Sequence, residues 1–132
     1  MKILNRGLRV YGDLEVGKSL GFIAGKNVGG TVTQTTSAST PVTINKYAGQ
    51  ITTVVLTTAA GAEEVFTVNN SKVKATDVVV VSTTYGGAGT PAVSVKGVAN
   101  GSFVIVITNL HASAALDAAM TINFAIIRAV NS

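Results

Sequence analysis

The chain of 132 residues contains no cysteine, no tryptophan and only two prolines. Without cysteine, disulfide bonds and thiolate metal ligands are excluded. Aromatic residues make up 5% of the chain, so the core is predicted to consist mainly of Val, Ile, Leu and Ala. Charged residues make up 12%, about half the usual share for a soluble domain. Such a weakly charged surface is typical of a protein that packs against other proteins, because a free monomer normally relies on charge for solubility.

Long hydrophobic runs are also missing. The longest uninterrupted apolar runs, Val78–Val81 and Phe103–Ile107, are far shorter than the roughly 20 residues that a membrane-spanning helix needs. The first residues, Met1–Arg6, lack the apolar stretch of a signal peptide. We therefore predict no membrane association.

Positive charge is concentrated near the start of the chain. Residues 1–26 contain five basic and two acidic side chains, within a total net charge of +4. This segment either is steered to an acidic surface or is simply a solvated arm, and the sequence leaves both interpretations open. The basic residues are neither grouped on one predicted strand nor interleaved with aromatic residues, so nucleic-acid binding is not predicted.

Residues 1–28 contain a six-residue repeat and are predicted to form an extended N-terminal arm. Each repeat has two apolar residues separated by one other residue, which places both on one face of a short extended segment. Such short strands cannot bury their apolar face alone. The arm is therefore predicted to be a trimeric stem or a docking segment, the alternative being a chance run of short strands. Its predicted contacts to a binding partner or to other subunits are Leu8, Val10, Leu14, Val16, Leu20 and Phe22.

Residues 29–132 are predicted to form an all-β domain, an antiparallel β-sandwich with a jelly-roll-like arrangement as one option. Val and Thr are abundant, and turn residues recur every eight to twelve positions. Asn100-Gly101 between two apolar runs is the strongest hairpin signal. Residues 112–119 are predicted to be a loop. The predicted strands are Thr31–Thr35, Val42–Asn45, Gln50–Thr58, Glu64–Asn69, Asp77–Thr83, Ala92–Val98, Ser102–Asn109 and Met120–Ala129.

Three of these strands are apolar on both faces: Val78–Val81, Val104–Ile107 and Phe124–Ile127. In a sandwich only one face of each strand meets the core, so the other face needs a second cover. A subunit interface supplies that cover and predicts a homo-oligomer, and a long loop folded over the outer face is the alternative. The repeats favour a trimer, although a dimer would cover the apolar faces equally well. The predicted subunit contacts in the sandwich are Val79, Val81, Phe124 and Ile126.

One motif resembles a nucleotide-binding loop. Gly12–Ser19 matches the pattern G-x-x-x-x-G-K-[ST] at every specified position. A phosphate loop is followed by a helix, whereas residues 20–30 contain four glycines, which disfavour one. Asp13 and Glu15 would also repel an anion. No nucleotide or other cofactor is predicted to bind here.

Catalytic and metal-binding clusters are not evident in the sequence. The only histidine, His111, lies beside a predicted turn and is interpreted as a surface residue. Asp117 is interpreted as a loop cap. Glu63 and Glu64 are adjacent on a predicted strand, so their side chains point to opposite faces and cannot form a carboxylate pair. We predict no catalytic, cofactor-binding or metal-binding residue, and no enzyme activity.

Seven short segments, taken in order, resemble a small β-domain that recurs in virion proteins of tailed bacteriophages. The resemblance covers residues 29–128, and its segments are Gly29–Gln34, Asn45-Lys46, Gly49–Thr52, Phe66–Ser71, Asp77–Val81, Asn109-Leu110 and Ile122–Ile127. It implies a β-sandwich virion structural protein without a cofactor. Similar domains occur both as separate head proteins and at the ends of fibre-like proteins, so the resemblance does not fix a location on the particle.

These observations favour a non-enzymatic decoration (cement) protein. Oligomers would sit on the outer capsid surface, bind the major capsid protein and reinforce the shell through many modest, symmetry-repeated contacts. The alternative is a trimeric fibre or tail-tip binding module, in which the repeats are the end of a stem.

Overall fold

The structure, a computed structural model, describes residues 29–130. These residues form eight β-strands and no helix, and one strand is found at each predicted position. Residues 112–119 lie in a loop up to the start of the last strand. The strands are β1 (Thr31–Thr33), β2 (Val42–Thr43), β3 (Ala48–Val55), β4 (Glu63–Asn69), β5 (Val78–Thr84), β6 (Pro91–Ala99), β7 (Ser102–Asn109) and β8 (Ala119–Ile127).

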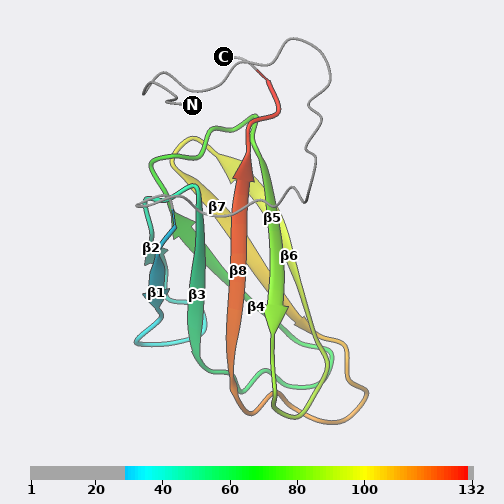
Figure 1. The fold of residues 1–132 in the computed structure, drawn as a ribbon. Helices are drawn as coiled ribbons and strands as arrows, with labels where there is room; N and C mark the ends of the chain where they lie inside the picture. The colour runs from blue at the N-terminus through cyan, green and yellow to red at the C-terminus, as the bar shows by residue number, and fades with distance from the viewer. Residues whose placement is uncertain (1–28, 131–132) are drawn as a thin grey trace, which may run out of the picture.

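The strands form two four-stranded sheets that pack face to face as a β-sandwich (Figure 1). Sheet A has the order β1-β3-β8-β5, and sheet B has the order β2-β4-β7-β6. The predicted purely antiparallel pairing is wrong at two places, because β1 pairs with β3 and β2 pairs with β4 in parallel. The first four strands alternate between the sheets, so the chain reverses twice before it returns to the same sheet. A strand that returns after two reversals runs parallel to its predecessor.

The core lies between the two sheets and consists mainly of aliphatic side chains, with three phenylalanines among them. Ile51 and Ile122 from sheet A meet Phe66, Ile105 and other residues from sheet B, and all of them are essentially inaccessible to solvent. Burial of each such side chain contributes roughly 1.5–3 kcal/mol. The alternation of inward and outward residues along each strand follows the pleat of the sheet.

A single aromatic pair joins the sheets at one end of the core. The rings of Phe103 on β7 and Phe124 on β8 lie 5.4 Å apart between centroids, at an interplanar angle of 54°. Gly49 on β3 is paired with Phe124, and a Cβ atom at Gly49 would lie 2.9 Å from the ring and 2.7 Å from Ile44 Cδ1. The Phe124 ring therefore occupies space that any side chain at position 49 would fill.

The hairpin predicted at Asn100-Gly101 is confirmed. Ala99 pairs with Ser102, which leaves a two-residue turn, and Gly101 has a φ of 85°. The turn also contacts the β4–β5 connection, because the Gly101 N–H donates to the Val73 carbonyl at 3.0 Å. The hairpin thus fixes a neighbouring loop as well as its own two strands.

Candidate interaction surface

Among residues 29–130, the strands of sheet A place no charged side chain on its outer face. Along each of its strands, alternate residues face away from the core, and the register places them in rows across the sheet. One row is Thr33, Thr52, Thr121 and Thr84, and the next is Thr31, Gln50, Asn123 and Ser82. The following rows are Ala48, Ala125 and Val80, and then Ile127 and Val78. We call these thirteen residues, which are all neutral, the neutral face.

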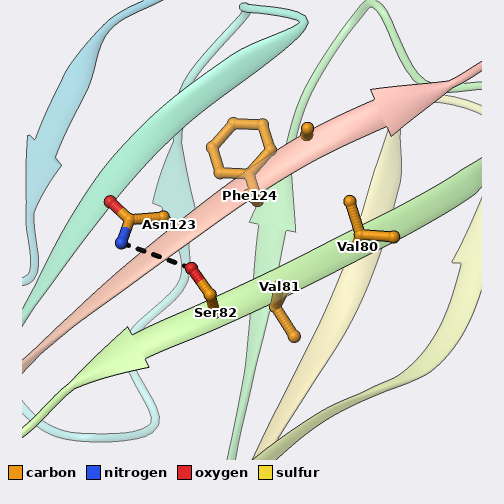
Figure 2. Close-up of a pocket in the computed structure, with 6 residues that line it drawn as sticks. Val80, Val81, Ser82, Asn123 and Phe124 are labelled. Atoms are coloured by element: carbon orange, nitrogen blue, oxygen red, sulfur yellow. Dashed lines mark hydrogen bonds between the residues drawn. The ribbon is translucent and has the colours of Figure 1, made fainter. Parts of the chain in front are cut away.

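One half of the neutral face is polar. Gln50 Nε2 donates a hydrogen bond to Asn123 Oδ1 at 3.0 Å, and Asn123 Nδ2 donates to Ser82 Oγ at 3.5 Å. These bonds link β3, β8 and β5 across the surface, and Figure 2 shows the second of them. Hydrogen bonds between neutral groups thus orient the side chains of Gln50, Asn123 and Ser82.

The other half of the neutral face is apolar. Val78, Val80 and Ile127 are 47%, 45% and 53% exposed, and the small Ala125 lies between β3 and β5. Beside Ala125 the surface is hollowed, with a cavity of about 320 Å³ lined by Val80, Val81, Ser82, Asn123, Phe124 and Ala125 (Figure 2). An exposed valine–isoleucine cluster beside a shallow hollow is typical of a surface that contacts another protein.

The outer face of sheet B differs in its charge. Glu63 on β4 and Lys96 on β6 are exposed there, and Thr108 Oγ1 donates a hydrogen bond to Glu63 Oε1 at 3.1 Å. Its apolar part is smaller, because Val106, although it points outward beside Val65, is buried by its neighbours. Sheet A therefore offers the better protein-contact face.

The four residues predicted as subunit contacts in the sandwich point toward the interior. Val79 and Phe124 belong to the core, at 9% and 4% exposed, and Val81 and Ile126 are partly buried against it. The prediction chose the wrong face of each strand. In Figure 2 the side chains of Val80 and Val81 leave β5 in opposite directions. The exposed apolar side chains of these strands are instead Val78, Val80 and Ile127.

A signal in the sequence could have identified the correct face. Asn123 lies between Ile122 and Phe124, and an amide side chain between two apolar residues of a strand normally faces solvent. If Asn123 points outward, so do Ala125 and Ile127, because side chains alternate. The four consecutive valines of β5 contain no such marker.

The four sheet edges are built differently. β1 and β2 have only three and two residues, and β6 begins at Pro91, contains Lys96 and has an irregular register between Val95 and Gly97. Short strands, lysine, proline and bulges all discourage pairing with another chain. β5 is seven residues long, has the sequence VVVVSTT and pairs in unbroken register with β8. Within the described residues, no strand pairs with its outer edge.

Tyr85 and Asp117 fix two loops at one end of the sandwich. The Tyr85 hydroxyl donates to the Ala88 carbonyl at 2.7 Å and accepts from the Asp117 N–H at 2.8 Å. Asp117 Oδ1 in turn accepts from the Ala88 N–H at 2.6 Å. Asp117 therefore caps the loop that follows β5. The Tyr85 hydroxyl joins this loop to the segment before β8.

Asn109 and His111 hold the same end together. Asn109 is fully buried; its Nδ2 donates to the carbonyls of Thr58 and Ala114, and its Oδ1 accepts from the N–H groups of Thr90 and His111. His111 Nδ1 accepts from the N–H groups of Ser113 and Ala114, at 3.1 and 2.8 Å. The imidazole thus orders its own loop.

Arg128 and Asp77 form an ion pair near the other end. Arg128 Nε lies 3.3 Å from Asp77 Oδ1, and the Asp77 side chain is fully buried while that of Arg128 is 37% exposed. Asp77 Oδ2 accepts the Lys74 N–H at 2.8 Å, and Arg128 Nη2 also contacts the Lys72 carbonyl at 3.4 Å. The residue after β8 therefore fastens the β4–β5 connection.

Several sequence predictions concern residues without a described structure. The arm contacts from Leu8 to Phe22 and the Gly12–Ser19 motif all lie outside residues 29–130. Among the described residues, no three His, Asp or Glu side chains are grouped as metal ligands. In that same part of the chain, no helix is long and apolar enough to cross a membrane.

Comparisons with known proteins identify no relative. No protein-family model, no curated protein sequence and no solved structure matches the chain.

Proposed function

We propose that the protein is a non-enzymatic decoration protein of a tailed-bacteriophage virion, which binds the outer capsid surface as an oligomer. The observation that carries the proposal is the neutral face, an exposed sheet surface that combines aligned polar side chains with Val78, Val80 and Ile127. Protein interfaces are depleted of charge at their centre, as this face is. The resemblance of residues 29–128 to virion β-domains supplies the biological setting.

The proposed mechanism is surface burial at junctions between capsid subunits. With strands about 4.8 Å apart and about 6.8 Å between residues on one face of a strand, the thirteen residues of the neutral face present roughly 420 Å². A contact of this size is weak on its own. Repetition around the capsid, together with the arm contacts predicted at Leu8–Phe22, would make many such contacts effective. The jelly-roll-like arrangement stays a prediction, supported by eight strands in two four-stranded sheets.

The copy number in purified particles tests this function. We expect a number close to that of the major capsid protein, measured by quantitative mass spectrometry of both proteins. A handful of copies per particle would contradict decoration and indicate the fibre or tail-tip module instead.

Two variants test the parts of the molecule. Thr121→Lys introduces charge in the polar half of the neutral face and is expected to weaken capsid binding, whereas Ser94→Lys, at an exposed position on sheet B, is the matched control. Deletion of residues 1–26 tests the arm, and unchanged particle binding of the truncated protein would refute its docking role.

A further inference from the structure

We infer that β5 is a self-association edge, through which two copies join their A sheets into one eight-stranded sheet. The inference rests on the oligomer part of the proposed function, and it names the partner of one edge, a second copy of this chain. It concerns the free protein in solution, so it can be tested without the particle.

The first support is the contrast among the four edges. β1, β2 and β6 each carry a feature that discourages strand addition, namely short length or proline, lysine and an irregular register. β5 has none of these features over Val78–Thr84. A seven-residue, uncharged, valine-rich edge exposes backbone N–H and C=O groups that another strand can pair with.

The second support is that β5 is compatible with itself. A two-fold axis perpendicular to the sheet makes the two β5 strands antiparallel and pairs residues that point to the same side. Centring the axis on Val81 pairs all seven residues, with Val80 opposite Ser82 of the other copy and Val78 opposite Thr84. No like charges oppose one another, because β5 contains no charged residue.

The consequence for the neutral face is direct. Both neutral faces would lie on the same side of the joined sheet, because a rotation about an axis perpendicular to the sheet does not turn the sheet over. The exposed Val80 of each copy would lie diagonally across the axis from Val80 of the other, with Ala125 of the same copy behind it, and the uncharged surface would be doubled.

The size of the contact sets its strength. A strand of seven residues is about 24 Å long, and packed sheets are about 10 Å apart, so the sandwich side that carries β5 offers roughly 240 Å² per copy. This is less than the ~800 Å² per partner of standard interfaces. We therefore expect a reversible dimer with a dissociation constant in the micromolar range.

Analytical ultracentrifugation of the full chain over a concentration series tests the edge. The wild-type protein should form a reversible species with an even number of copies: two, or six where the arm also forms trimers. Val80→Lys should raise the dissociation constant at least about tenfold, because it places lysines close together across the axis. Thr31→Lys, exposed on the same face but on the opposite edge strand, should change it less than about twofold. A trimer or monomer at every concentration, or equal effects of both variants, would overturn the inference.

Cysteine cross-linking tests the register, since the chain has no cysteine of its own. Antiparallel partners have Cα atoms about 4.5–5.5 Å apart, which suits a disulfide. Under mild oxidation, a mixture of Val80→Cys and Ser82→Cys chains should give the mixed disulfide in preference to either homodimer. No mixed disulfide under conditions where the protein is dimeric would refute the proposed pairing. Because neither experiment uses capsids, a failure here leaves the copy-number test of the decoration function intact.

Discussion

Replacement of Asn109 by alanine should cost more stability than any other single change to a polar side chain described above. The side chain is fully buried and makes four hydrogen bonds, two donated to carbonyls and two accepted from N–H groups. Each buried group left without a partner costs about 1–3 kcal/mol, although partial entry of water reduces the sum. We expect a loss of about 3–5 kcal/mol, a large fraction of the ~5–15 kcal/mol that stabilises a typical domain.

Urea unfolding followed by circular dichroism measures this loss. The midpoint should fall while the slope of the transition stays the same, and Tm should fall by roughly 15–25 °C. Asn123→Ala is the matched control, because it removes hydrogen bonds of the same chemistry at an accessible site and should cost less than about 1 kcal/mol. Losses within about 1 kcal/mol of each other for the two variants would refute the role given to Asn109.

Three further predictions concern packing and charge, each measured by the same unfolding experiment. Gly49→Ala should destabilise the protein by about 2–4 kcal/mol, because the added Cβ would collide with the Phe124 ring. Gly97→Ala is the control: no atom lies within 4 Å of its added Cβ, and stability should change by less than about 1 kcal/mol. Val79→Ala should cost about 2 kcal/mol and Val78→Ala less than about 1 kcal/mol; the reverse order would show that β5 presents its other face to the core. Arg128→Ala should cost about 1–2 kcal/mol, because it leaves a buried carboxylate without its cation, and an unchanged midpoint would contradict this.

The strands could be predicted because their composition and their boundaries agree. Val- and Thr-rich runs ended at turn residues such as Gly61 and Gly101, which both have positive φ angles in the structure. The order of the strands could not be predicted in the same way. Nothing within Thr31–Thr33 indicates that it pairs in parallel with β3, because that choice depends on how the connections cross between sheets.

The candidate surface could be located only to the correct strands. The runs Val78–Val81 and Phe124–Ile127 were chosen because they are apolar on both faces, and the neutral face does include residues of both. Four identical valines contain no information about which face is buried, so the choice within the run depended on the neighbouring strand. The network around Asn109 joins segments 51 residues apart in sequence, and no local pattern indicates it.

The position of β8 has a consequence for how the protein is made. Of the eight described strands, β8 is synthesised last, yet it lies between β3 and β5, which do not pair with each other. While the ribosome is still adding residues 119–127, β3 and β5 have no strand between them, and sheet A cannot close. The neutral face needs Asn123, Ala125 and Ile127 from that same strand. A chain interrupted before β8 therefore lacks both a complete core and the surface proposed to bind the capsid.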